Sequence, residues 1–328
     1  MKARLSSLSA GAAITFYFAA TLLVQGQFQF APLQPQTNKE MVVSLTTPAN
    51  TNYDILVSSN ALDWQALVTV LSAGSSITHT DSAAPFLANR YYRGLQLTNS
   101  NAVTGDHLAT SEGDVIIHPG NHAGFVMRWT NITVYVDPNV NVYQGLPLAD
   151  LILLTHAHGD HLNPTTINAI KGSSAVILAP QVVYNTSSFS ALRSITSVLT
   201  NGMQTNLLGL RVNAVPAYNY TAGRQNQHPT NVGNGYILTM GGKRIYISGD
   251  TEDTPEMRAL QNIDVAFLAM NQPYTMTVAQ AVGAARAFVP KVVYPYHYSP
   301  SSPVIDLASF KQQVMTNPCV EVRLRKWY

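Results

Sequence analysis

The chain has 328 residues, of which 46% are hydrophobic and only 11% are charged. This length exceeds that of one typical domain, roughly 100 to 200 residues, so we expect two domains with sizeable cores. The formal charge is +2, and it vanishes if the basic residues Lys2 and Arg4 are removed with a signal peptide. A neutral chain has no electrostatic footprint for nucleic acid, so we expect no nucleic-acid partner. A single cysteine, Cys319, excludes an intrachain disulfide and a cysteine-rich metal site.

Residues 1–26 have the pattern of a secretory signal peptide. Lys2 and Arg4 precede an uncharged stretch from Leu8 to Val24, which leads into small and polar residues. The alternative is a retained membrane anchor, because the stretch is near the lower limit for spanning a bilayer. The short apolar region favours cleavage. We therefore expect a secreted or periplasmic protein with no stable membrane insertion after signal cleavage.

Residues 27–38 are rich in Gln and Pro, which is typical of an extended linker. Residues 39–98 contain short β-prone runs separated by Asn, Ser, Thr, Pro and Gly, which favours a small all-β sandwich. The order of its residues resembles the immunoglobulin-like or fibronectin-like modules appended to exported bacterial proteins. Such a module could bind a surface glycan or polymer. The predicted strands are 41–45, 53–57, 66–70 and 91–97.

The segment from Asp150 to Asn163 carries the strongest functional pattern, D-L-I-L-L-T-H-A-H-G-D-H-L-N. Its apolar residues 151–154 predict a short buried strand that leads into three histidines and one aspartate. Side chains two apart on an extended strand end point the same way, so His156 and His158 can hold one metal ion. Asp160 and His161 can serve a second ion. These donors suit zinc, although manganese or iron would also fit.

This segment resembles the metallo-β-lactamase superfamily, whose H-x-H-x-D-H motif reads here as His156-Ala157-His158-Gly159-Asp160-His161. The resemblance implies an α/β hydrolase domain over residues 99–328 with the αββα metallo-β-lactamase sandwich, preceded by the small all-β domain. Strands and short helices alternate after residue 114, in agreement with that fold. In the superfamily an apolar strand often ends in an aspartate that supports the metal loop, and Asp137 occupies that place.

Two later residues match the remaining superfamily ligands. Asp250 follows the β-prone residues 243–248 and matches the metal-bridging aspartate, whose two oxygens can be shared between two ions. His297 also follows a predicted strand and matches the last histidine ligand. Their order after the first motif supports both assignments.

The third position departs from the common pattern. Most relatives have a histidine where this chain has Asn219, and His228 lies nine residues further on. The sequences A-Y-N, H-P, Y-I-S-G-D-T and Y-P-Y-H resemble uncharacterised metal-dependent hydrolases related to ascorbate-6-phosphate lactonase and to N-acylphosphatidylethanolamine phospholipase D. Either His228 or Asn219 completes the shell of the first ion, and imidazole is the better zinc ligand.

We therefore expect an exported, lactonase-like hydrolase with two divalent ions, zinc first among them, acting on a small-molecule substrate. A metal-bound hydroxide would cleave a lactone, carboxylic ester, phosphodiester or β-lactam. The catalytic candidates are Asp160, which could protonate the leaving group, and Asp250. The expected ligands are His156, His158, Asp160, His161, His228, Asp250 and His297, and the candidate substrate contacts are His122, Tyr218, Asn219 and Tyr274.

Two alternatives follow from the same residues. His122 lies in a His-Ala turn found in one branch of the superfamily, and it either faces the site or is hydrogen-bonded in the core. The whole chain could also be a non-catalytic exported protein in which the metal fold is a scaffold and the β-module binds a glycan. The full set of ligands argues against that second reading.

Overall fold

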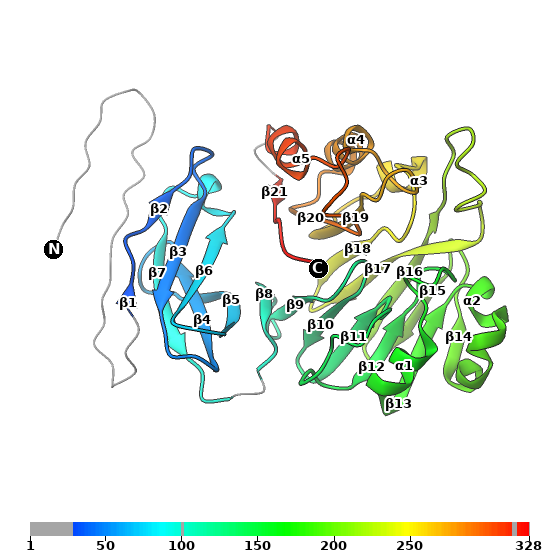
Figure 1. The fold of residues 1–328 in the computed structure, drawn as a ribbon, viewed down its shortest axis with the longest axis horizontal. Helices are drawn as coiled ribbons and strands as arrows, with labels where there is room; N and C mark the ends of the chain where they lie inside the picture. The colour runs from blue at the N-terminus through cyan, green and yellow to red at the C-terminus, as the bar shows by residue number, and fades with distance from the viewer. Residues whose placement is uncertain (1–28, 100–101, 317–319, 328) are drawn as a thin grey trace. The chain divides into compact units, whose positions relative to one another are not determined.

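The computed structural model describes residues 29–99, 102–316 and 320–327 (Figure 1). The predicted signal peptide, residues 1–26, lies outside the described residues. The chain divides into two compact units, Met1–Ala109 and Thr110–Tyr328. No helix within the described residues has the length and apolarity needed to cross a membrane.

The first unit consists of two antiparallel sheets. In one sheet, β3 (Met41–Thr46) pairs with three other strands, and in the other the strand order is β8-β5-β4-β7. Alternate residues of β3 are buried and pack against Tyr53 and Ile55 of the facing sheet, which gives the sandwich its core. The other elements are β1 (Gln29–Phe30), β2 (Gln34–Pro35), β4 (Thr51–Ser58), β5 (Gln65–Ser72), β6 (Ser76–Asp81), η1 (Ala84–Phe86), β7 (Tyr91–Gln96) and β8 (Gly105–Leu108).

Two stretches near the predicted boundaries differ from the sequence expectation. Part of the expected linker forms β1 and β2, which pair with β3, and Pro35 is tolerated because β2 is an edge strand. At the other end β8 pairs with β5, so regular structure of the first unit continues beyond residue 98. Short runs without apolar alternation carry no sequence signal for a strand, because pairing alone makes them extended.

The second unit contains two mixed sheets. The first has the order β14-β13-β12-β11-β10-β9, and the second runs from β15 to β21 in chain order. In both sheets an antiparallel part continues into parallel strands. The strands are β9 (Val115–Pro119), β10 (Phe125–Trp129), β11 (Ile132–Val136), β12 (Ala149–Leu153), β13 (Lys171–Ala179), β14 (Thr196–Val198), β15 (Gln204–Leu207), β16 (Leu210–Ala217), β17 (Gly233–Met240), β18 (Lys243–Ile247), β19 (Val265–Ala269), β20 (Val292–Tyr296) and β21 (Glu321–Val322).

Helices cover the outer faces of the two sheets, which confirms the αββα sandwich (Figure 1). The inner faces meet where Phe125 stacks on Phe267, with ring centroids 4.2 Å apart. Beside the first sheet lie α1 (Pro164–Ile170), α2 (Gln181–Asn185) and the 3-10 helix η2 (Ser187–Ile195). Beside the second lie α3 (Pro255–Arg258), α4 (Val278–Phe288) and α5 (Leu307–Val314).

The ends of these helices follow from their sequences. Helix α4 begins at Thr277, whose side chain forms a reciprocal capping box with Gln280. Helix α1 is capped by Asn163 and ends at Ile170, because Lys171 already belongs to β13. Gly172 allows that close approach, since a Cβ there would lie 2.9 Å from the carbonyl oxygen of Ala149.

Candidate metal centre

The loop that carries His156 to His161 is held in place by Asp137, which directly follows β11. Its Oδ1 accepts the backbone N–H of Thr155 over 2.8 Å, and its Oδ2 accepts the Thr155 hydroxyl over 2.7 Å. The same Oδ2 lies 2.8 Å from Nδ1 of His161. All three residues are buried. Since Nδ1 of His161 donates to Asp137, its Nε2 lone pair is free to face a metal ion, as expected for a supporting carboxylate.

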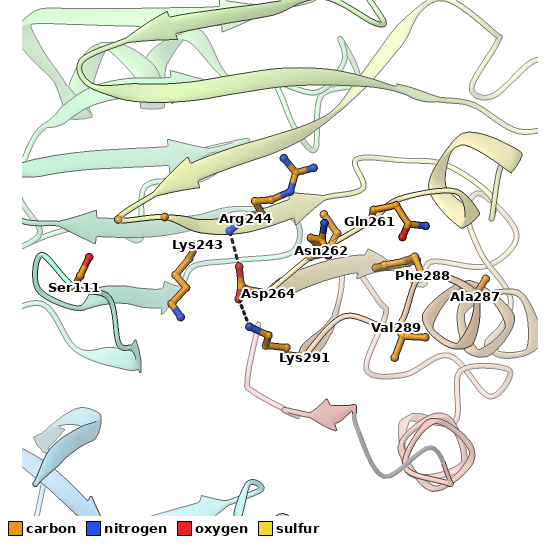
Figure 2. Close-up of a pocket in the computed structure, with 13 residues that line it drawn as sticks. Ser111, Lys243, Arg244, Gln261, Asn262, Asp264, Ala287, Phe288, Val289 and Lys291 are labelled. Atoms are coloured by element: carbon orange, nitrogen blue, oxygen red, sulfur yellow. Dashed lines mark hydrogen bonds and ion pairs between the residues drawn. The ribbon is translucent and has the colours of Figure 1, made fainter. Parts of the chain in front are cut away.

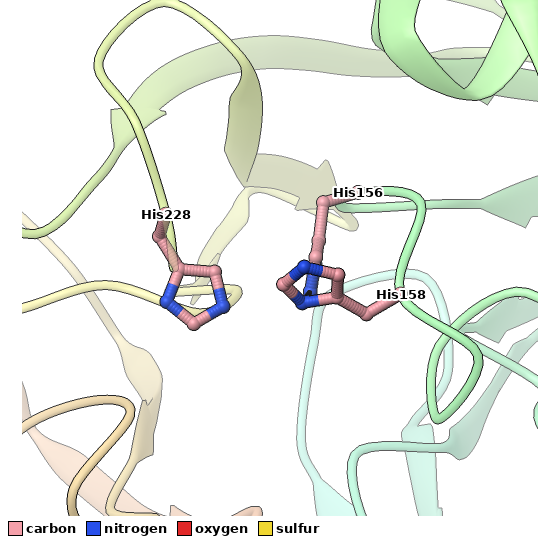
Figure 3. A group of neighbouring side chains, drawn as sticks. All are labelled: His156, His158 and His228. Carbon is pink, nitrogen blue, oxygen red and sulfur yellow. Dashed lines mark hydrogen bonds between the residues drawn. The ribbon is translucent and has the colours of Figure 1, made fainter. Parts of the chain in front are cut away.

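Three imidazoles form the first group of candidate ligands, His156, His158 and His228 (Figure 3). The Thr155 hydroxyl already donates to Asp137, so it accepts from His156 Nδ1 over 3.0 Å and leaves Nε2 of that ring free. This Nε2 lies 3.0 Å from Nδ1 of His158. Figure 3 shows His228 reaching the pair from the opposite loop.

His228 is held in the tautomer that a metal ligand needs. Its Nδ1 lies 3.1 Å from the carbonyl oxygen of Tyr274, which only a protonated nitrogen can approach as a donor. Its Nε2 is buried and has no hydrogen-bond partner. Asn219 is buried beside it and donates its amide to Tyr274 O and Arg224 O over 2.7 and 3.2 Å. The structure therefore places His228, and not Asn219, with the other two imidazoles.

The second group lies at the end of β20 and the tip of the first loop. Nε2 of His161 is 2.8 Å from Nε2 of His297. Oδ2 of Asp160 lies 3.5 Å from Nε2 of His297 and 3.8 Å from Nε2 of His161. His122 faces the site, because its Nε2 is 3.0 Å from that same oxygen and its ring centroid is 4.0 Å from that of His297.

Asp250 lies between the two groups. Its Oδ2 is 3.2 Å from Nε2 of His228 and 3.9 Å from Nε2 of His156. Its Oδ1 is 3.3 Å from Nε2 of both His161 and His297. Gly249 makes the turn after β18 with a φ of 61°, and a Cβ there would lie 2.8 Å from the carbonyl oxygen of Asn234. The turn therefore presents one carboxylate to both groups, with one oxygen for each.

Both carboxylates of the site are anionic. Burial alone would raise the pKa of Asp160, but hydrogen bonds from His122 and His297 hold it below its usual range. Burial likewise opposes ionisation of Asp250, yet His297 and His161 keep its pKa well below the ordinary value. The two negative charges are therefore present at neutral pH for a cation to neutralise.

The histidines divide into two kinds. Burial lowers the pKa of His156 and His158, and neighbouring imidazoles lower both further, so these rings are neutral ligands. Burial also acts to lower the pKa of His161, but the carboxylates of Asp250 and Asp137 raise it well above its ordinary value. A cation that binds there must displace a proton from His161.

These residues fit divalent metal ions. Nε2 of His228, Oδ1 of Asp250 and Nδ1 of His297 are all buried without a hydrogen-bond partner. Two imidazole nitrogens at 2.8 Å need a proton or a cation to offset the repulsion of their lone pairs. Nitrogen and carboxylate donors are those that zinc, manganese and iron accept.

Two hollows open onto this cluster, one of about 160 Å³ and one of about 360 Å³. A larger hollow of about 760 Å³ lies at the other end of β18 to β20, where these strands begin. Figure 2 shows Asp264 there, paired with Lys291 and with the backbone N–H of Arg244. Within the described part of the chain, none of the candidate ligands lies in that larger hollow. Its size therefore does not make it the metal site.

The four predicted substrate contacts are placed differently. Tyr274 lines the 360 Å³ hollow, and His122 contacts Asp160. The Tyr218 hydroxyl instead donates to Glu256 over 3.0 Å, and both hollows at the cluster are lined by other residues. Asn219 is buried behind His228.

Sequence reasoning missed two side chains that line these hollows, Gln227 and Asn271. Gln227 precedes His228 and could have been found from that position alone. Asn271 lies just after β19, at the same edge of the sheet as Asp250. A polar residue in that place is a signal only once the strand order is known.

Comparisons with known proteins agree with this geometry. Residues 117–297 match the β-lactamase superfamily domain, a range that contains all the predicted ligands. The UPF0173 metal-dependent hydrolase of Nanoarchaeum equitans is 32% identical over 182 residues, covering 54% of this chain and 81% of that protein. That of Alkaliphilus metalliredigens is 31% identical over 209 residues, covering 60% of this chain and 91% of the relative. A solved structure from Parabacteroides distasonis, described as a candidate metal-dependent hydrolase, is 41% identical with a TM-score of 0.61. The match covers 68% of this chain and 99% of that chain.

Proposed function

Because the chain belongs to the metallo-β-lactamase superfamily, in its UPF0173 family of metal-dependent hydrolases, we propose that it cleaves an ester-like bond with two divalent ions, zinc first among them. The observation that carries the proposal is the position of Asp250, whose two oxygens are divided between two groups of imidazoles. A buried carboxylate in this position suits two cations better than one.

The ligands fall into two sets in this proposal. His156, His158 and His228 would hold the first ion, and Asp160, His161 and His297 the second, with Asp250 shared. Such ions lower the pKa of bound water to about 7 and polarise the substrate oxygen. The residues contribute the anionic charge, the fixed tautomers and the dry environment that the ions require.

Asp160 has a further role in the proposal, because it lines the wider hollow. Its side chain is 44% exposed, and hydrogen bonds from His122 and His297 lower its pKa and keep Oδ2 anionic. That oxygen could take a proton from the attacking water and pass it to the leaving oxygen. His122, 3.0 Å away, fixes the orientation of the carboxylate.

The experiment is a substrate-class screen on metal-loaded protein, with lactones, carboxylic esters, phosphodiesters and a β-lactam. We expect turnover of at least one class, its loss after chelation and its return when zinc is added. Asp250→Asn should abolish turnover, and the matched control Asp264→Asn, at the other edge of the sheet, should retain it. Two bound ions without turnover of any class would favour the non-catalytic binding protein.

We also propose that the hydrolase is exported and that the first unit is a separate module. The support is the signal-peptide pattern of residues 1–26 and the self-contained core of the first unit. N-terminal sequencing of secreted or periplasmic material should find a chain that starts after residue 26, and Met1 retained in a membrane fraction would contradict the export proposal.

A protein of residues 110–328 should stay soluble and keep its metal. Loss of activity on polymeric substrate alone would support a targeting role for the module.

A further inference from the structure

The two hollows beside the metal ligands are parts of one binding site. They share His158, Gln227, His228 and Asp250 in their walls. A molecule whose reacting atoms lie against the cluster can therefore reach both hollows, with one end in each. The walls of each hollow then describe the chemistry of one end of the substrate.

The narrow hollow is largely apolar away from the ligands. Its walls include the side chains of Ala157, Val182, Ala217, Pro229 and Val232. Its volume of about 160 Å³ includes the space between His156, His158, His228 and Asp250 that the first ion would occupy. Only a short acyl group would fit in the hollow beside that ion.

The wide hollow presents neutral polar side chains that have no partner. Gln227, Asn271 and Tyr274 line it, and within the described residues no hydrogen bond is made by the side chain of Asn271 or by the Tyr274 hydroxyl. Oε1 of Gln227 is buried and also lacks a partner. A buried polar atom without a partner costs free energy, and a ligand that bonds to it removes that cost.

Among the residues that the structure describes, no lysine or arginine lines either hollow. Arg224 is nearby, but its Nη1 lies 2.7 Å from Oε1 of the buried Glu252, and its Nε donates to the carbonyl oxygen of Pro273 over 2.6 Å. Its charge is therefore neutralised and its donors are used. A phosphate group in the part of the wide hollow away from the proposed ions would find carboxamides and no cationic side chain, whereas charge-assisted bonds are the usual means of binding it.

We infer that the substrate is an uncharged carboxylic ester or lactone with a short apolar acyl group and a hydrogen-bonding group, such as an amide, on its alcohol side. The inference rests on the proposed hydrolase function. Water adds to the carbonyl carbon, the bond from that carbon to the alcohol oxygen breaks, and a proton from the water ends on that oxygen. The products are a carboxylic acid and an alcohol, which remain one molecule if the substrate is a lactone.

The test compares three butyrate esters on the full, metal-loaded chain: the butyl, the 2-acetamidoethyl and the 2-phosphoethyl ester. We expect the acetamido ester to have the highest kcat/KM and the phosphorylated ester the lowest. The decanoate of the same acetamido alcohol should react at least about tenfold more slowly, because its chain exceeds the narrow hollow.

Variants of residues that line the two hollows test whether those residues cause the preference among the esters. Gln227→Leu should raise KM for the acetamido ester about threefold to tenfold more than KM for the butyl ester, the worth of one hydrogen bond, in protein that keeps its metal. The control is Gln225→Leu, an exposed position on the same loop. Val232→Phe should reduce turnover of butyrate more than of acetate, and the control Val304→Phe, at a residue 60% exposed, should change neither.

Two outcomes would overturn the inference while leaving the hydrolase intact. One is a higher kcat/KM for the phosphorylated ester, or for bis(4-nitrophenyl) phosphate, than for the neutral esters. The other is a Gln227→Leu or Asn271→Ala protein that keeps two ions and loses no preference for the amide. If the metal-loaded chain hydrolyses nothing from any class, the hydrolase proposal itself fails and the inference fails with it.

Discussion

Two buried aspartates, one in each unit, show what separates a structural carboxylate from a functional one. Asp81 in the first unit accepts from Arg90 Nε over 2.6 Å, from the Tyr92 hydroxyl over 3.0 Å and from the backbone N–H of Ala83 over 3.1 Å. Asp250 in the second unit is also buried, but Oδ1 has no hydrogen-bond partner and both oxygens face imidazoles. Burial is common to both, so the lack of a donor at Oδ1 among the described residues distinguishes Asp250 as a candidate metal ligand.

The largest expected effect comes from removing each carboxylate in turn. Asp250→Asn should lose metal at both positions and reduce kcat/KM by more than about 100-fold, since even a supporting residue costs 10-fold to 100-fold. Asp81→Ala should instead lower the unfolding free energy of the first unit by about 3–5 kcal/mol, because it leaves Arg90 unpaired. Metal analysis and thermal unfolding measure the two effects. Metal loss in the Asp81 variant would contradict this distinction between a structural and a functional carboxylate.

A smaller but still large effect is expected from His228→Ala. Because Nε2 of His228 is buried and unpaired, this variant should lose the first ion and nearly all turnover while keeping the second ion. Metal content and activity are measured on the same sample.

The matched control for His228 is Asn219→Ala. Asn219 holds the loop through Tyr274 O and Arg224 O, so its variant should keep both ions with metal affinity reduced by about tenfold. If the Asn219 variant loses the first ion and the His228 variant keeps both, the two assignments must be exchanged. Metal kept but turnover lost in His228→Ala would make His228 a substrate contact.

Asp137→Asn should have a smaller effect than the loss of a ligand, since this carboxylate contacts only the ligand loop. An amide can still accept from Thr155, but it no longer stabilises the protonated Nδ1 of His161 by charge. Affinity for the second ion should fall about 10-fold to 100-fold. Competition with a metal indicator is the measurement. An unchanged affinity would show that Thr155 alone holds the loop.

The parts of the site that the sequence predicts are those whose partners lie close in the chain. The residues from His156 to His161 sit on one loop, and Asp250 and His297 each follow an apolar strand, so chain order places them together. The role of Asn219 depends on Tyr274, 55 residues away, and could not be deduced from spacing.

The fold shows the same limit. The strands β3, β12 and β18 were predicted near their observed bounds from the runs 41–45, 151–154 and 243–248. The short strands β1, β2, β8 and β21 have no apolar pattern of their own, and helix α5 has an apolar face of few residues. Such elements depend on pairing and packing that local sequence does not encode.

The number of metal ions bound per chain tests the central claim most directly. Elemental analysis of purified, metal-replete protein after removal of loosely bound ions is the measurement. The account predicts two ions per chain, because three imidazoles lie on one side of Asp250 and two imidazoles with Asp160 lie on the other. One ion per chain would contradict the shared role of Asp250, and none would reject the site.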